Sequence, residues 1–143
     1  MNSGMLMDAV DCALCEFYQG TTTSYMKMKL LTYEELQHHD EIKKRVLRLI
    51  RENKTTTKEM AQVNVSSGID LADAVLRMLK NANLTLDDVD VVSTHDRTIW
   101  LLSMPRGKQI KAALTMAEGS ILAKILNKTI VNDFRVHEHF YGR

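Results

Sequence analysis

Hydrophobic and polar positions alternate through the first 31 residues in a way that predicts two strands. Residues 10–18 carry apolar side chains on both alternating faces, which is typical of a central strand. Residues 25–31 alternate more cleanly, with methionine and leucine opposite Lys27 and Lys29, which predicts a half-exposed strand. The threonine-rich segment 19–24 between them predicts a turn, so the two strands are expected to form a hairpin.

A spacing of three and four residues between apolar positions predicts two helices in the next part of the chain. The first is expected over residues 40–53 with Asp40 as its cap, and the second over residues 57–81 with Thr57 as its cap. Their apolar stripes are Ile42, Val46, Leu49 and Ile50, then Met60, Val63, Leu71, Val75 and Leu79. Gly68 is either tolerated within the second helix or allows close packing there.

Short apolar runs in the second half of the chain predict further strands. The valine-rich run 89–92 ends in polar residues around His95, and runs 98–102, 112–116 and 129–131 follow. A turn is expected at 105–107, and a helix with Ser120 as its cap separates the last two runs. A helix between strands favours a crossover to a parallel neighbour. We therefore predict one α/β domain over residues 1–143, with a mixed sheet and flanking helices.

Composition limits the class of protein. The 143 residues are 45% hydrophobic and 26% charged, with a formal net charge of +1, which is ordinary for a soluble globular domain. No apolar run approaches the ~20 residues that span a bilayer, and the N-terminus lacks the basic region of a signal peptide. We expect a cytoplasmic protein without a membrane partner.

The cysteines and histidines leave a metal or redox site as the weaker interpretation. Cys12 and Cys15 stand three apart on a predicted strand, so their side chains point to opposite faces and favour apolar packing. His137 and His139 flank Glu138 near the end of the chain and offer only part of a zinc site. His38 and His39 lie in a charged segment and are expected to be solvated.

The helix expected over residues 40–53 has a basic face. It consists of Lys43, Lys44, Arg45, Arg48 and Arg51. Such a face can bind phosphate or an anionic membrane, but the sequence offers no interleaved aromatics and only a small net charge. A solvated face is favoured, nucleic acid is not an expected partner, and a basic-helix binding module stays open as an alternative.

Polar residues at the predicted strand ends, where open α/β sheets bind ligands, occur in four blocks that resemble those of a known family. The blocks are Ser3 to Asp11 (SGMLMDAVD) for SGTSxDGxD, His95 to Trp100 (HDRTIW) for HGQTxW, Ala117 to Ser120 (AEGS) for GExS, and Asn132 to Arg135 (NDFR) for SDFR. In this order and spacing they resemble the anhydro-N-acetylmuramic acid kinase family, within the actin-like, hexokinase-like ATPase superfamily.

The resemblance implies a fold, a reaction and a set of roles. The fold would be the first lobe of an actin-like ATPase, which is ribonuclease H-like. The reaction would be ATP-dependent phosphorylation of an amino sugar with hydrolytic opening of its 1,6-anhydro ring. Asp133 would be the catalytic base that activates water. The other implied roles are ATP binding for Ser3, Gly4 and Asp8, Mg²⁺ binding for Asp8, and sugar binding for His95, Glu118 and Arg135.

Departures from the family pattern lead us to expect little or no kinase activity from this chain alone. Met5 and Leu6 replace the Thr-Ser of the phosphate loop, and thioether or alkyl groups donate nothing to phosphate. Two lost hydrogen bonds to charged oxygens, at about 1.5–3 kcal/mol each, slow a reaction by roughly two to four powers of ten.

The resemblance also implies that the chain starts inside the phosphate loop and stops where a glycine-rich phosphate-binding block begins. We therefore expect only part of the first lobe. The alternative function is a non-catalytic interaction protein that forms homo- or hetero-oligomers through an exposed sheet edge.

Overall fold

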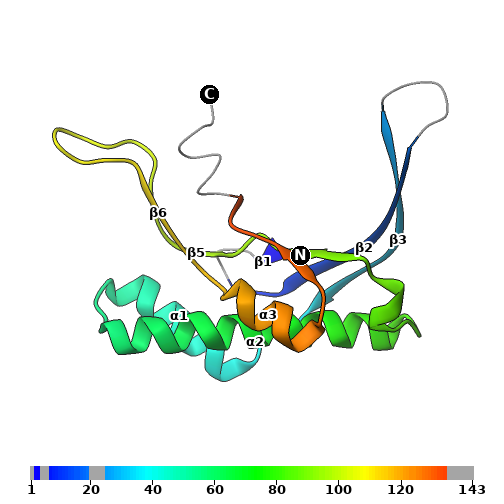
Figure 1. Ribbon diagram of the computed structural model, residues 1–143. Helices are drawn as coiled ribbons and strands as arrows, with labels where there is room; N and C mark the ends of the chain where they lie inside the picture. Colours follow the sequence, from blue (N-terminus) through cyan, green and yellow to red (C-terminus); the bar gives the residue numbers. More distant parts are fainter. Residues whose placement is uncertain (1, 4–6, 20–24, 135–143) are drawn as a thin grey trace.

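The computed structural model describes residues 2–3, 7–19 and 25–134 of the chain (Figure 1). Within them the chain runs β1 (Asn2–Ser3), β2 (Val10–Gln19), β3 (Met26–Leu36), α1 (Asp40–Glu52), α2 (Thr57–Asn81), the 3₁₀ turn η1 (Leu86–Asp88), β4 (Val91–Ser93), β5 (Arg97–Leu102), β6 (Ala112–Met116), α3 (Gly119–Leu126) and β7 (Thr129–Val131). The predicted strands and helices are confirmed in kind and order.

The helices form one layer along α2, and two hairpins rise away from that layer (Figure 1). One hairpin is β2–β3 and the other is β5–β6, each with antiparallel pairing. The expected turn before residue 112 occurs between β5 and β6, where the N–H of Gln109 donates to the carbonyl of Arg106 at 3.2 Å.

The strands pair in three separate ladders, so the expected single mixed sheet is wrong in detail although the α/β class is right. The order is β1-β2-β3 in one ladder, β4-β7 in another and β5-β6 in the third. Antiparallel pairs occupy the first and third, and β4 and β7 are parallel, with Val92 opposite Ile130. The β2–β3 ladder contains a bulge at Leu14/Cys15, and β4 is only 3 residues long.

The core lies between α2 and the strands and follows the predicted apolar stripes. Val10 and Cys12 of β2 pack with Leu71 and Val75 of α2. A second cluster joins α1, α2 and β6, and its buried members are Met7, Val46, Leu49, Val63 and Met116. Burial of these stripes is the main source of stability for helices of this length.

The expected helix caps are displaced by one or two residues. His39 precedes α1 without a side-chain cap, and Asp40 is its first helical residue. At α2 the hydroxyl of Thr56, not Thr57, accepts the N–H of Glu59 at 3.1 Å. At α3 the carboxylate of Glu118, not Ser120, caps the helix. A cap residue needs extended backbone angles, and periodicity alone does not locate them.

The prediction for the two cysteines is confirmed, because they lie on opposite faces of β2. Cys12 is buried in the main core and Cys15 is half-buried, and both are free thiols. Burial raises the pKa of Cys12 to about 11, so this thiol stays protonated and behaves as a small apolar side chain.

The basic face of α1 is partly neutralised by α2. Arg45 donates to both carboxylate oxygens of Glu59 at 3.0 Å, and Arg48 donates to Glu59 at 3.0 Å. Lys44 pairs with Glu41 at 3.1 Å. These contacts leave less positive charge for a polyanion than the sequence suggests.

In the part of the chain that the structure describes, no helix is long and apolar enough to cross a bilayer.

Candidate functional site

Three acidic residues gather where β4, β6 and β7 end. Asp96 follows β4, Glu118 follows β6 and Asp133 follows β7. Because β4 and β7 are parallel, their carboxyl ends meet at the same edge, and the N–H of Thr94 donates to the carbonyl of Val131 at 3.0 Å. Asp96, Glu118 and Asp133 therefore lie in one neighbourhood, in which the charges of Asp133 and Glu118 act on Asp96, and we call it the acidic site.

Asp96 links β4 to the segment that carries Asp133. Its Oδ2 accepts the Nδ2–H of Asn132 at 3.1 Å, and its carboxylate accepts the backbone N–H of Asp133. Asp96 is 5% exposed, and its Oδ1 has no hydrogen-bond partner among the described residues. Burial, with the neighbouring charges of Asp133 and Glu118, raises the pKa of Asp96 to about 6 despite these hydrogen bonds.

Glu118 is held in place by its own helix and by α2. Its Oε1 accepts the hydroxyl of Ser120 at 2.8 Å, and its Oε2 accepts the Nδ2–H of Asn64 at 3.0 Å. Hydrogen bonds from Ser120 and then from Asn64 lower the pKa of Glu118 below its usual range. The carboxylate is therefore ionised and pre-oriented.

Asn64 of α2 also fixes the backbone before α3. Its Oδ1 accepts the N–H of Ala117 at 3.0 Å, and its carbonyl accepts the N–H of Glu118 at 3.2 Å. Asn64 was not among the predicted site residues. Its spacing of four residues from Gly68, on one side of α2, is the signal that could have revealed it.

Two glycines bring the parts of the acidic site together. A Cβ on Gly68 would lie 2.9 Å from the carbonyl oxygen of Glu118, and a Cβ on Gly119 would lie 2.7 Å from Nδ2 of Asn132. Both separations are too short for a real Cβ contact. Gly68 therefore lets α2 approach the backbone of Glu118, and Gly119 leaves room for the Asn132 side chain that binds Asp96.

Asp133 occupies a strained and exposed position. Its φ of 64° lies in the left-handed region, which non-glycine residues adopt infrequently and which is often associated with functional sites. Thr115 donates its hydroxyl to Oδ1 of Asp133 at 3.2 Å. The exposed carboxylate has remaining acceptor capacity for water or a ligand hydroxyl, as a general base requires.

The other predicted site residues have more limited structural support. His95 is half-buried and lies one residue before Asp96. Asp8 is exposed, and its Oδ1 accepts the N–H of Ala9 at 3.1 Å. Ser3 belongs to β1, whereas Gly4, Arg135, His137 and His139 lie outside the described residues. The described part of the chain contains no group of three or more His, Cys, Asp or Glu side chains arranged for a metal ion.

A buried ionic network lies behind the acidic site and corrects the prediction that His38 is solvated. Nδ1 of His38 is 2.6 Å from Oδ2 of Asp70, and the N–H of His39 donates to Oδ1 at 3.0 Å. Nη2 of Arg97 lies 3.1 Å from Nδ1 of His38 and 3.8 Å from Oδ2 of Asp70. His39 itself is exposed, as expected.

Arg97 extends this network, because its Nη1 donates to the hydroxyl of Ser67 at 3.3 Å. Burial lowers the pKa of Arg97 to about 10, opposed by the charge of Asp70. The guanidinium is still charged at neutral pH. It anchors the start of β5, directly after Asp96, to α2.

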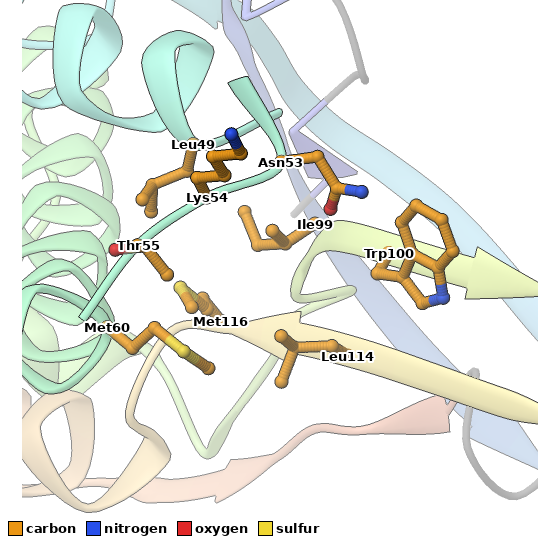
Figure 2. Close-up of a pocket in the computed structure, with 9 residues that line it drawn as sticks. All are labelled: Leu49, Asn53, Lys54, Thr55, Met60, Ile99, Trp100, Leu114 and Met116. Carbon is orange, nitrogen blue, oxygen red and sulfur yellow. The ribbon is translucent and has the colours of Figure 1, made fainter. Parts of the chain in front are cut away.

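A separate pocket of about 210 Å³ lies between the end of α1 and the β5–β6 hairpin (Figure 2). It is lined by Leu49, Asn53, Lys54, Thr55, Met60, Ile99, Trp100, Leu114 and Met116. Its lining is mainly apolar and includes none of the three acids. The acidic site is therefore the better candidate for chemistry on a polar substrate.

Comparison with known proteins identifies one family. The model of the anhydro-N-acetylmuramic acid kinase family matches residues 1–142. The anhydro-N-acetylmuramic acid kinase of Bacillus cereus strain Q1 is 26% identical over 140 residues, covering 98% of this chain and 36% of the relative. That of Caldanaerobacter subterraneus subsp. tengcongensis is 28% identical, covering 95% of this chain and 35% of the relative. The chain thus spans about a third of the length of these relatives.

Proposed function

The chain belongs to the anhydro-N-acetylmuramic acid kinase family, and we propose that it provides the sugar-binding side of such a site, with Asp133 as general base. The family reaction is ATP-dependent phosphorylation of an amino sugar with hydrolytic opening of its 1,6-anhydro ring. The observation that supports the proposal is the convergence of Asp96, Glu118 and Asp133 at the ends of β4, β6 and β7.

The roles follow from the chemistry of each side chain. Asp133 is exposed, so its carboxylate takes a proton from the water that attacks the sugar. Glu118 is ionised and fixed by Ser120 and Asn64, so it accepts hydrogen bonds from sugar hydroxyls. Asp96 holds the backbone of Asp133 and thereby positions the base. His95 and Arg135 would contribute further contacts to the sugar.

The residues assigned to ATP and Mg²⁺ fit these groups poorly. Met5 and Leu6 stand where phosphate binding calls for hydroxyl groups. Asp8, the implied Mg²⁺ ligand, already accepts the N–H of Ala9 with one oxygen. We therefore propose that the sugar is bound while phosphoryl transfer by this chain alone is inactive or nearly so, and we assign no step to the nucleotide.

Thermal unfolding of the purified chain tests the sugar-binding proposal. We expect the melting temperature to rise with 1,6-anhydro-N-acetylmuramic acid and not with Mg-ATP, because a ligand at 100 times its Kd stabilises the native state by about 2.7 kcal/mol. Asp133→Asn and Glu118→Gln should weaken the shift, whereas Asp87→Asn, an exposed change in η1, should not. A wild-type transition that saturating sugar leaves unmoved would contradict the proposal.

A phosphorylation assay tests the second part separately. With ATP, Mg²⁺ and the anhydro sugar, we expect no sugar phosphate above the background of a protein-free control. Measurable transfer that disappears in Asp133→Asn would show that the phosphate loop works despite Met5 and Leu6. That result would overturn the inactivity and leave sugar binding supported.

A non-catalytic interaction protein is the second candidate, and the exposed β2–β3 hairpin favours it.

A basic-helix binding module is less favoured, because Glu59 pairs with both Arg45 and Arg48. Salt-sensitive binding to nucleic acid or anionic vesicles, lost when Arg45, Arg48 and Arg51 are reversed to Glu, would support that third possibility.

A further inference from the structure

The pocket between the end of α1 and the β5–β6 hairpin lies on the other face of the hairpin from the acidic site. Leu114 and Met116 alternate with Thr115 along β6, so their side chains lie on one face of the strand and that of Thr115 on the other. The hydroxyl of Thr115 binds Asp133, whereas Leu114 and Met116 line the pocket. The β5–β6 ladder therefore separates the pocket from Asp133.

The pocket has room for one small ring with a short side chain. Its volume is about 210 Å³, and an apolar cavity of about 150 Å³ is enough to hold benzene. Sites for drug-sized ligands are larger, at roughly 300–1,000 Å³. The pocket is therefore too small to enclose a nucleotide, and it fits a ligand of about ten non-hydrogen atoms.

The apolar side of the pocket suits an aromatic ring. Trp100 pairs directly with Leu114 across the hairpin and is 50% exposed, so its indole is accessible to a second ring. Aromatic rings favour offset or edge-to-face packing against one another. Met60 and Met116 also line the pocket (Figure 2), and thioether sulfur makes favourable contacts with aromatic rings.

The rest of the lining is polar and carries one charge, which is positive. Asn53, Lys54 and Thr55 belong to the linker between α1 and α2 and face the hairpin across the pocket (Figure 2). No lining residue is acidic. Among the described residues, the side chains of Asn53 and Lys54 have no hydrogen-bond or ion-pair partner. The ammonium of Lys54 and the amide of Asn53 can therefore both donate to an anionic group.

We propose that this pocket binds a small aromatic monocarboxylate, with its ring against Trp100 and the two methionines and its carboxylate at Lys54. Hydrogen bonds between charged partners are stronger than those between neutral ones, which favours a carboxylate over a hydroxyl or amide group. One ammonium neutralises one negative charge, which favours a monocarboxylate over a dianionic phosphate. This proposal is independent of the sugar-binding proposal, because the pocket contains none of the three acids.

Trp100 is the only tryptophan in the chain, so its fluorescence reports on this pocket. We would titrate the purified 143-residue chain with 3-phenylpropionate at about 0.15 M ionic strength, where exposed charges more than about 8 Å apart are largely screened. We expect a saturable shift of the emission to shorter wavelength, because the ring displaces water from the indole. A Kd of roughly 0.1–1 mM is reasonable for a ligand of this size. Acetate, a carboxylate without a ring, should cause no shift.

Lys54→Glu tests the position of the carboxylate. It should raise the Kd for 3-phenylpropionate about five- to twentyfold, because an exposed charge pair is lost and a like charge takes its place. Lys58→Glu is the matched control, since Lys58 is an exposed lysine in the first turn of α2 that does not line the pocket. It should leave the Kd within about twofold. The neutral 3-phenylpropanamide should bind the wild type about two- to fivefold more weakly and should not distinguish the two variants.

Thermal unfolding with the same compounds gives a readout that does not depend on Trp100. The proposal would be overturned if 3-phenylpropionate at about 20 mM, well above the expected Kd, changed neither the emission nor the melting temperature of the wild type. Equal weakening by Lys54→Glu and Lys58→Glu would also overturn it, because binding would then follow net charge. So would an equal shift with acetate, or competitive displacement of 3-phenylpropionate by the anhydro sugar, which would make the pocket part of the sugar site.

Discussion

Asp96 is a buried carboxyl group whose pKa is raised well above its usual value. The family pattern has a glycine directly after the histidine, whereas Asp96 takes that position here and binds Asn132 and the backbone of Asp133. Asn132 itself replaces the serine of the family block. Two departures from the family pattern thus contact each other, which indicates a rearranged site rather than independent losses.

The buried carboxyl group of Asp96 predicts that replacing it with asparagine changes how the free energy of unfolding depends on pH. The pKa of Asp96 rises from 3.8 to about 6 on folding, mainly through burial. A raised carboxyl pKa favours the native state below about pH 4, and this contribution is lost as the pH rises through 6. Relative to wild type, Asp96→Asn should therefore gain stability between pH 4 and 7, by up to about 3 kcal/mol.

Urea denaturation of both proteins at pH 4, 5.5 and 7 measures this difference. An asparagine can keep the bond from Asn132 with its oxygen and place its NH₂ at the position of the unpartnered Oδ1. Asp87→Asn, in exposed η1, should show no such pH-dependent gain. A constant difference between wild type and Asp96→Asn across this range would contradict the shifted pKa.

His38 shows why some residue environments could not be predicted from the sequence. Its partners Asp70 and Arg97 lie 32 and 59 residues away, and local charge density suggested a solvated side chain. Only the fold places the three groups together. By contrast, the strand end that carries Asp133 follows from a local apolar run, whereas Glu118 was assigned to the same site through the family resemblance, and that assignment stays a prediction.

At the scale of elements, the sequence located helices well and their first residues less well. Apolar stripes define the body of α2, and its range 57–81 agrees with the structure. The cap depends on the backbone angles of one residue, and two threonines, Thr56 and Thr57, both qualify by type. Thr56 has the extended angles, with φ −101° and ψ 155°.

A pair of alanine substitutions separates the two threonines. Thr56→Ala removes the acceptor for the N–H of Glu59 and should lower the free energy of unfolding by about 1 kcal/mol. Thr57→Ala, within the first helical turn, should change it by less than about 0.5 kcal/mol. Urea denaturation at pH 7 measures both values, and an equal or larger loss for Thr57→Ala would contradict the assigned cap.

The β2–β3 hairpin shows that alternation of apolar and polar residues predicts which side chains share a face, but not which face is buried. Alternation predicted that Met26 and Met28 share one face and Lys27 and Lys29 the other, and the register confirms this. It did not reveal which face α2 would cover. In the structure α2 covers the inner half of the lysine-bearing face, and the methionine face is exposed. The expectation of one continuous sheet failed because local apolar runs do not show which strands pair, and the structure has three separate ladders.

At the scale of the whole molecule, α2 couples the core to the acidic site through Gly68. An exposed helical glycine replaced by alanine gains up to about 1 kcal/mol of helix propensity. At Gly68 the added Cβ would lie 2.9 Å from the carbonyl oxygen and 3.3 Å from the nitrogen of Glu118. These are backbone atoms bonded to Asn64 and the start of α3, so they cannot move aside without displacing Glu118.

Gly68→Ala should therefore lower the free energy of unfolding by about 1–3 kcal/mol, the usual cost of overpacking, despite the better helix propensity. It should also weaken binding of the anhydro sugar in the thermal-shift experiment, because Glu118 is displaced. Ala61→Gly, at an exposed site of the same helix, should cost about 1 kcal/mol from propensity and leave the ligand shift intact. A stabilised Gly68→Ala would mean that α2 and α3 separate easily, and that the acidic site does not depend on their close approach.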